Sequence, residues 1–161
     1  MKQEMKRHET VAVGGTFDEL HKGHRTLLMK AFEAGQHVQI GLCSDNFVKK
    51  LGKPHITASY NQRLKELEDF LRKNGLHERA EIFRLDDPYG VTLSGGNTEA
   101  LVVSKETGPT AVLINKKRKG SGLPPLQIVT IDMVPSENHF PISTTRIRCG
   151  EIDREGHLLK T

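Results

Sequence analysis

Two histidines stand three residues apart at the start of a candidate helix, in the segment "TVAVGGTFDELHKGH" of residues 10–24. An imidazole has an ordinary pKa of about 6.5, so it can donate a hydrogen bond to a phosphate oxygen whether neutral or charged. A helix N-terminus favours phosphate as well, through its dipole and its free N–H groups. His21 and His24 are therefore predicted to hold nucleotide phosphates and to stabilise charge that develops at an α-phosphorus.

Glycines precede these histidines, where an apolar, strand-like segment ends. Gly14 and Gly15 have no Cβ, so the backbone N–H groups there are predicted to come close to an anion. Neither GxxxxGK[ST] nor GxGxxG occurs at this point of the chain. Zinc ligation by His21 and His24 is disfavoured, because no HExxH pattern and no nearby cysteine accompanies them, and no metal ligand set is predicted.

A second polar cluster lies near the C-terminus in "ISTTRIR", residues 142–148. Hydroxyls and free N–H groups at the start of a helix suit phosphate oxygens, which makes Ser143, Thr144 and Thr145 candidate nucleotide-binding residues. Taken alone, the segment fits a plain helix cap with a solvated arginine equally well. The histidine motif favours the phosphate interpretation.

The elements that must position these residues are read from hydrophobic periodicity. An amphipathic helix with Ser59 as its N-cap is the clearest element, and the segment "TAVLIN" is assigned to a crossover helix, although its propensity also fits a strand. Strands are predicted at residues 10–15, 37–43, 80–85, 99–104 and 126–134, and helices at 23–35 (ended by Gly35), 59–75, 107–119 and after Ser143.

Alternating strands and helices predict an α/β fold, a Rossmann-like doubly wound five-stranded parallel sheet with helices on both faces. Ligands of such sheets bind beyond the carboxyl ends of the strands. The Gly14–His24 loop, the Asp86–Gly90 loop and the segment 141–148 would then share one edge of the sheet.

Composition limits the class of protein. The 161 residues carry a net charge of +4 with 5% aromatic residues, and the two cysteines are far apart. We predict a tail over residues 1–9, one domain over 10–161, reduced thiols and a cytoplasmic location, because neither a signal peptide nor an apolar run of about 20 residues occurs. Few aromatics are available to stack bases, so an anionic small molecule is favoured over nucleic acid, and no membrane partner is expected.

"GGTFDELHKGH" and "ISTTRIR", in this order, resemble the two signatures of the HxGH nucleotidyltransferase superfamily. Further stretches, "LVVSKET", "INKKRKGSGLPPLQI" and "IDMV", are similar to the phosphopantetheine adenylyltransferases of archaeal and eukaryotic type. The similarity runs from Val11 to Arg148. It implies a fold of nucleotidyltransferase type and the transfer of AMP from ATP to 4′-phosphopantetheine, which gives dephospho-coenzyme A and pyrophosphate.

The resemblance also implies roles for single residues. Gly15, Thr16 and Phe17 would line the nucleotide site through their backbone, and the Thr16 hydroxyl would touch the acceptor's phosphate. His21 and His24 would contact the ATP phosphates. The hydroxyl cluster of residues 143–145 would bind the β- and γ-phosphates. Arg148 fits the basic position of the family motif, and Arg146 is the alternative.

Further basic and polar residues are candidates for the same edge. Lys53 resembles a lysine that neutralises both reacting phosphates, and Lys49 and Lys50 compete for that role. Asn115 and Arg118 lie one helical turn apart and could both bind phosphate. Asp86 and Tyr89, with Asp87 between them in sequence, could bind the pantetheine arm or simply form a turn.

In-line attack by a phosphate anion needs no general base, so positioning and charge stabilisation would carry the catalysis. Mg²⁺ is expected with ATP as cofactor, held mainly by the substrate. The rival hypotheses are another enzyme of the superfamily, such as an FMN adenylyltransferase or a cytidylyltransferase, and a non-catalytic nucleotide- or RNA-binding module.

Overall fold

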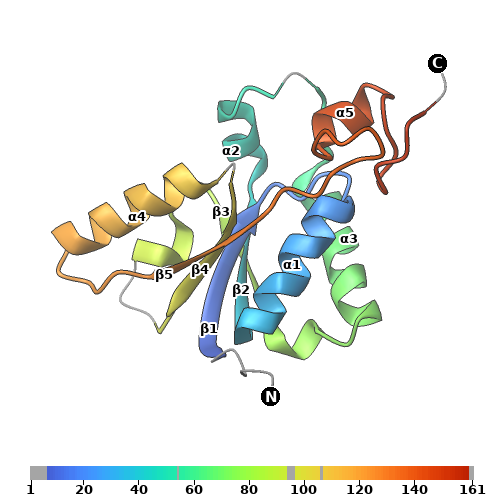
Figure 1. The fold of residues 1–161 in the computed structure, drawn as a ribbon. Helices are drawn as coiled ribbons and strands as arrows, with labels where there is room; N and C mark the ends of the chain where they lie inside the picture. Colours follow the sequence, from blue (N-terminus) through green and yellow to red (C-terminus); the bar gives the residue numbers. More distant parts are fainter. Residues whose placement is uncertain (1–6, 54, 94–96, 106, 160–161) are drawn as a thin grey trace.

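The computed structural model describes residues 7–53, 55–93, 97–105 and 107–159. This part of the chain forms five parallel strands in the order β3-β2-β1-β4-β5, with helices on both faces of the sheet (Figure 1). The predicted fold class is therefore confirmed. The elements in chain order are β1 (His8–Gly15), α1 (Lys22–Ala34), β2 (Gly35–Cys43), α2 (Asp45–Lys50), α3 (Tyr60–Lys73), the 3-10 turn η1 (His77–Arg79), β3 (Ala80–Leu85), the 3-10 turn η2 (Gly90–Leu93), β4 (Ala100–Ser104), α4 (Gly108–Gly120), β5 (Gln127–Ile131) and α5 (Thr144–Arg148).

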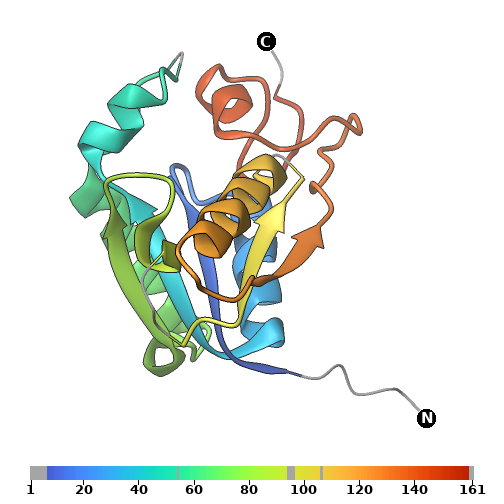
Figure 2. The ribbon, with the colours of Figure 1, turned by 90° about the vertical axis from the view of Figure 1, so that its left-hand side faces the viewer.

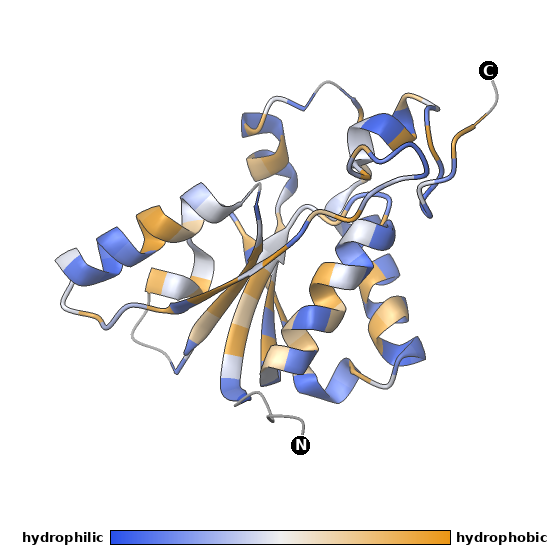
Figure 3. Ribbon diagram, in the orientation of Figure 1, coloured by the Kyte–Doolittle hydropathy of each residue, from blue (hydrophilic) through white to orange (hydrophobic). Residues whose placement is uncertain are grey.

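Each face of the sheet has its own core. On the face covered by α1 and α3, here called the α1 face, large side chains are fully buried; they include Val11, Val13, Ile40, Leu28, Leu67 and Leu71. The opposite face, called the α4 face, is covered by α4 and η2 and has a smaller core of Ala12, Leu101, Val103, Ala111, Ile114 and Leu126. Figure 2 shows α4 lying in front of the strands, and Figure 3 shows the apolar residues concentrated along the sheet.

β1 is the central strand of the sheet. The next two strands in the chain, β2 and β3, lie on one side of it, and β4 and β5 lie on the other side. Adjacent loops therefore depart in opposite directions from the carboxyl end of β1, which creates a crevice there. The N-terminus of α1, together with α2 and α5, lies at this same end of the sheet (Figure 1). The expected functional edge is thus assembled by the topology.

Several predicted boundaries change in the structure. β1 begins at His8, two residues inside the predicted tail, whose residues 1–6 lie outside the described part of the chain. Gly35 does not end α1 in a turn but opens β2 with extended backbone. A Cβ at this position would lie 2.8 Å from Val11, so glycine is required there by packing and not by a helix stop. β5 stops at Ile131 rather than residue 134, and the short helix α2, capped by Ser44, was not predicted.

Other expectations concern the crossover, the thiols and the membrane. Residues 108–120 are helical, which decides against the strand alternative for "TAVLIN". Both cysteines are free, Cys43 buried and Cys149 exposed. Within the described ranges, none of the helices is long and apolar enough to span a bilayer.

Candidate active site

A cleft of about 440 Å³ opens at the carboxyl edge of the sheet and continues along the α4 face. Its rim carries polar groups and its inner walls are mainly apolar. The rim includes Thr16, Asp18, His21, His24, Lys53, Ser143, Thr144 and Thr145, and the inner walls include Ala12, Gly41, Phe83, Leu85, Tyr89, Leu101, Val103, Ala111 and Ile114. A polar mouth above an apolar channel suits a ligand with a charged head and a less polar tail.

The two histidines form a reciprocal cap at the start of α1. His21 is the N-cap, and its Nδ1 accepts the N–H groups of Gly23 at 3.0 Å and His24 at 3.3 Å. His24 Nδ1 accepts the His21 N–H in return, at 3.3 Å. This is the geometry of a capping box with imidazoles in both positions. Because each Nδ1 is an acceptor, the neutral rings carry their proton on Nε2.

This cap corrects one expectation about the helix start. The N–H groups of its first turn are already used: Lys22 donates to the Arg154 carbonyl at 2.8 Å, Gly23 and His24 donate to His21, and Arg25 donates to the His21 carbonyl. The backbone of α1 thus has no free amide in its first turn to offer a phosphate. The imidazole Nε2–H groups are the donors left there, and the helix dipole still acts in their favour.

Both rings are held neutral at physiological pH. Burial, together with the positive charges of Arg25 and Arg154, lowers the pKa of His21 to about 4. Burial lowers the pKa of His24 well below its usual value, and His21 and Lys53 act in the same direction. A neutral ring with its proton on Nε2 can donate a hydrogen bond from that atom without carrying a charge.

The rings are also fixed in place by their neighbours. His21 and His24 stack with centroids 3.6 Å apart, and Phe17 meets His24 edge-on at 5.4 Å. Phe17 has a φ of 51°, a left-handed conformation rare for an aromatic residue, which costs roughly 1–3 kcal/mol. A Cβ on Gly23 would approach the His21 ring to 2.8 Å, so glycine at this position leaves room for the ring.

The glycines at the end of β1 also have a packing role that the sequence did not indicate. A Cβ on Gly14 would lie 3.2 Å from Leu85, and one on Gly15 would lie 3.3 Å from the Phe17 ring. Gly41, the partner of Gly14 in β2, also makes room for Leu85. These glycines therefore admit the side chains of Leu85 and Phe17, although both Gly14 and Gly15 line the cleft as expected.

The hydroxyl cluster lies on the same rim, beside the loop that leads to the histidines. Ser143 caps α5 by accepting the Arg146 N–H at 3.2 Å, and the Thr144 hydroxyl donates to the Asp18 carbonyl at 2.9 Å. The amides of Thr144 and Thr145 make no hydrogen bond within the described residues. In contrast to α1, this short helix leaves two N–H groups and the Thr145 hydroxyl available to a ligand at the cleft.

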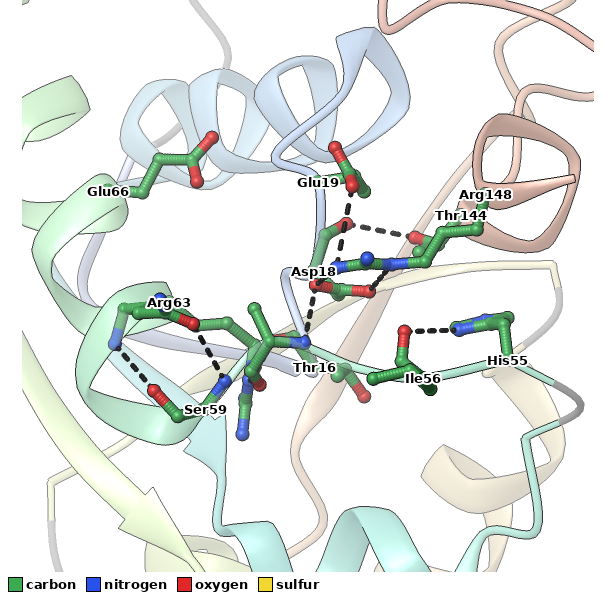
Figure 4. A network of polar contacts seen from close by, with 12 residues as sticks. Thr16, Asp18, Glu19, His55, Ile56, Ser59, Arg63, Glu66, Thr144 and Arg148 are labelled. Atoms are coloured by element: carbon green, nitrogen blue, oxygen red, sulfur yellow. Dashed lines mark hydrogen bonds and ion pairs between the residues drawn. The ribbon is translucent and has the colours of Figure 1, made fainter. Parts of the chain in front are cut away.

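Neither arginine of this segment points into the cleft. Arg148 forms two hydrogen bonds of 2.8 Å with the carboxylate of Asp18, which is 1% exposed (Figure 4). Arg146 donates to Ser136, Asn138 and the carbonyls of Phe140 and Pro141. Both guanidinium groups hold the fold of the C-terminal segment, so the structure does not bring the predicted nucleotide ligand Arg148 to the cleft.

Asp18 is a site residue to which the sequence pattern assigned no role. Burial by itself would raise the pKa of Asp18, but hydrogen bonds from Arg148 and the Ala58 N–H hold that pKa below its usual value. The hydrogen bond to Asp18 in turn raises the pKa of Arg148. This ion pair ties the first loop to α5 and to the segment before α3, and Asp18 could have been singled out as the one acid inside the "GGTFD" motif.

The other predicted site residues divide into two groups. Lys53 and Tyr89 line the cleft, whereas Lys49, Lys50 and Asp86 do not. Asn115 and Arg118 are also away from it. Asn115 exchanges two hydrogen bonds with the Leu126 backbone, and Arg118, 3% exposed, donates to the carbonyls of Pro124 and Thr92. Their predicted phosphate contacts do not occur in this arrangement, because both side chains stabilise the connection between α4 and β5.

The sequence pattern indicated no role for Arg63, which the structure shows to be a buried anchor of the site's edge. Its side chain is 1% exposed and donates to the carbonyls of Ala58, Thr16 and Cys43, which joins the ends of β1 and β2 to α3. The signal in the sequence was a charged residue in register with Leu67 and Leu71 on the buried stripe of α3.

Comparison with known proteins agrees with this geometry. The model of the cytidylyltransferase-like family matches residues 12–150. A solved structure of a protein of unknown function from Archaeoglobus fulgidus is 30% identical, with a TM-score of 0.69 over 83% of this chain and 99% of that one. A bifunctional NMN adenylyltransferase/ADP ribose pyrophosphatase from Francisella tularensis, 17% identical with a TM-score of 0.60 over 89% of this chain and 42% of that one, shares the fold.

Among curated proteins, the phosphopantetheine adenylyltransferase of Methanothermobacter thermautotrophicus is 48% identical over 96% of this chain and 92% of its own length. The proteins of that name from Methanosarcina mazei and Pyrococcus horikoshii are 46% and 42% identical, over 93% and 97% of this chain and 97% and 98% of their own lengths. The chain therefore belongs to the cytidylyltransferase-like family and, within it, to the phosphopantetheine adenylyltransferases.

Proposed function

We propose that this protein transfers the AMP group of ATP to 4′-phosphopantetheine, giving dephospho-coenzyme A and pyrophosphate. The observation that carries the proposal is the reciprocal histidine cap. It aligns two neutral Nε2–H donors at the rim of a cleft, and the same rim also carries the two amides of α5 that make no hydrogen bond and the Thr145 hydroxyl. The relatives named phosphopantetheine adenylyltransferase, which match nearly the whole chain, support the choice of reaction.

The reaction needs little from the protein beyond position and charge. A phosphate oxygen of the acceptor attacks the α-phosphorus of ATP in line, the new P–O bond forms, and the bond to the β-phosphate oxygen breaks as pyrophosphate leaves. The attacking oxygen is already an anion, so no side chain must remove a proton. His24 and Lys53 are proposed to stabilise the negative charge that grows on the transferring group, and His21 orients His24.

ATP is proposed to enter as its Mg²⁺ complex, with the ion neutralising charge on the phosphates. The nearest buried carboxylate, Asp18, has both oxygens engaged by Arg148. Asp132, at the mouth of the cleft, is paired with Lys105 at 3.2 Å. The side chains present therefore fit a substrate-borne ion better than a dedicated carboxylate site.

The two substrates are proposed to occupy different parts of the cleft. The triphosphate would lie between the histidine cap and α5, where the hydrogen-bond donors gather. The acceptor's phosphate would meet it at Thr16 and Lys53, and its pantetheine arm would run along the α4 face. The arm is flexible and only moderately polar, which suits walls made of Ala12, Phe83, Leu101 and other apolar residues.

The direct test is pyrophosphate release with ATP, Mg²⁺ and one acceptor at a time. Release with 4′-phosphopantetheine, and none with FMN or with a small alcohol phosphate, is the expected result. Release with FMN alone would move the protein to another activity of the superfamily. No release with any acceptor, together with tight RNA binding, would overturn the enzymatic proposal.

A further inference from the structure

The floor of the cleft carries a polar side chain well away from the rim. Gln39 lies in the middle of β2, in register with Ala12 of β1, and its side chain lines the cleft on the α4 face. The strand residues that surround it in the lining are small or apolar, namely Ala12, Gly41, Phe83 and Leu101. A primary amide in such surroundings needs hydrogen-bond partners, because an unpaired amide shielded from water is costly.

Among the described residues, one end of this amide has a hydrogen-bond partner. The hydroxyl of Thr98, itself buried, donates to Gln39 Oε1. Gln39 Nε2 makes no hydrogen bond to any of the described residues. It is also not fully buried, because among those residues the fully buried side-chain nitrogen or oxygen without a partner is His55 Nε2. Gln39 Nε2 is therefore open to the cleft. Thr98 fixes the orientation of the amide, so its N–H groups face the cleft before any ligand arrives.

We propose that Gln39 binds the pantetheine arm of the acceptor by donating a hydrogen bond to its outer amide carbonyl, the one between the β-alanyl and cysteamine units. This inference rests on the proposed function and names the residue that selects the acceptor. A hydrogen-bond donor at a fixed depth in an apolar channel favours binding of a ligand with an acceptor atom at that depth. A ligand that lacks this atom leaves the donor unpaired and binds more weakly.

The depth of Gln39 distinguishes the two amides of the arm. Gln39 is four residues before Cys43, so it lies about 13 Å below the end of β2 at the usual rise of a strand. About nine bonds separate the phosphorus from the outer carbonyl carbon, which is roughly 11 Å in an extended chain with standard bond lengths. Adding a hydrogen bond of about 3 Å spans the distance. The inner carbonyl, about five bonds from the phosphorus, reaches only about half as far.

The test compares Gln39→Leu with the wild type on two acceptors. One is 4′-phosphopantetheine, and the other is a phosphorylated N-heptyl pantoamide, which keeps the inner amide and replaces the rest of the arm by methylene groups of equal length. We expect the wild type to prefer 4′-phosphopantetheine, with a KM lower by about 10-fold or more, the value of a hydrogen bond lost from a buried donor. Gln39→Leu should lose that preference.

Other readouts separate binding from folding. KM for ATP and kcat should stay unchanged in Gln39→Leu, because the contact is equally strong in ground and transition states. Gln36→Leu is the matched control: Gln36 lies on the same strand and is exposed, and its side chain accepts a hydrogen bond from Arg7 at 3.0 Å. Its backbone carbonyl, which accepts from Arg79, is unchanged by the substitution. Thr98→Val, which frees the amide to rotate, should give an intermediate KM.

Each outcome decides between the inferences. If the wild type converts 4′-phosphopantetheine but has the same KM for both acceptors, the role of Gln39 is refuted and the proposed function stands. The same holds if Gln39→Leu keeps the wild-type preference. If Gln39→Leu does not fold, Gln39→Met takes its place in the comparison. If the wild type forms no dephospho-coenzyme A at all, the proposed function fails instead.

Discussion

Each histidine of the motif does two things at once. Its Nδ1 accepts a backbone N–H and thereby caps α1, and this fixes the ring and leaves the proton on Nε2. The spacing of three residues is the spacing between the N-cap and N3 positions, which is why the pair can cap reciprocally. Folding alone thus orients the two donors, which is the preorganisation that the proposed charge stabilisation requires.

Two substitutions of His24 separate these roles. Asparagine places an amide atom where Nδ1 stands and keeps the cap, whereas glutamine places one near Nε2. His24→Asn should lower kcat by roughly 10²–10³-fold, because the charge-stabilising donor is lost, with little change in thermal stability. His24→Gln should retain more activity. Steady-state rates of pyrophosphate release measure both, and an unchanged kcat in His24→Asn would refute the role of this ring.

The lowered pKa values predict how stability depends on pH. His21 titrates at about 4 in the folded protein and at about 6.5 when unfolded, so between these values the unfolded chain binds more protons. The stabilisation is complete above about pH 6.5 and falls by about 3 kcal/mol as the pH drops toward 4. Burial shifts the pKa of His24 in the same direction and adds to the loss.

Urea denaturation at a series of pH values measures this dependence. In His21→Asn, where asparagine can still cap the helix, the slope of the unfolding free energy between about pH 4.5 and about pH 6 should decrease by about 1.4 kcal/mol per pH unit, the value for one proton. A slope equal to that of the wild type would contradict the lowered pKa of His21.

At the scale of elements, Arg63 fixes the edge of the sheet on which the site is built. It projects from the first turn of α3 and donates to carbonyls at the ends of both β1 and β2, the strands that lead into the histidine loop and α2. Parallel strands leave such carbonyls exposed at their ends, and a buried guanidinium satisfies several of them together. The loop of Thr16 is therefore anchored by a helix almost fifty residues further along the chain.

Replacing Arg63 by methionine keeps much of the volume and removes the donors. Three carbonyls lose this donor, that of Cys43 buried and those of Ala58 and Thr16 half-buried, so we expect Arg63→Met to lower the free energy of unfolding by about 3 kcal/mol. Arg72→Met is the matched control on the same helix, since its side chain is 56% exposed, and it should cost less than about 0.5 kcal/mol. Equal effects in denaturant titrations would show that Arg63 is not a structural anchor.

At the scale of the molecule, the N-terminal and C-terminal parts of the chain are held together beside the site by ion pairs. Asp18 and Glu19 follow β1. Asp18 pairs with Arg148 of the C-terminal segment (Figure 4), and Glu19 pairs with Arg154. The Arg154 carbonyl also takes the Lys22 N–H at the start of α1. The C-terminal segment therefore helps to position the two proposed phosphate-binding motifs relative to each other.

The Asp18–Arg148 pair should respond asymmetrically to substitution. Arg148→Met leaves a buried carboxylate without its partner and should cost about 3 kcal/mol or more. Asp18→Asn should cost about 1 kcal/mol, because Arg148 is 26% exposed and can still reach Glu19. The double variant should be no less stable than Arg148→Met alone. Additive losses in denaturant titrations would mean that the two residues are not coupled.

Hydrophobic periodicity and the two motifs determined the fold class, the edge of the sheet that carries the candidate site, and the histidines and hydroxyls at its rim. These features depend on the local spacing of residue types, which can be read directly from the amino-acid sequence. Lys53 was indicated only by the family resemblance, with Lys49 and Lys50 as alternatives. Only the tertiary structure decided which partners the charged residues take. Arg118 donates to backbone carbonyls and Arg148 to the carboxylate of Asp18, and these partners lie apart from the arginines in sequence. Arg63 binds the ends of β1 and β2, which come almost fifty and twenty residues earlier in the chain. Burial, which lowers the pKa values of both histidines, likewise arises only when distant segments pack together.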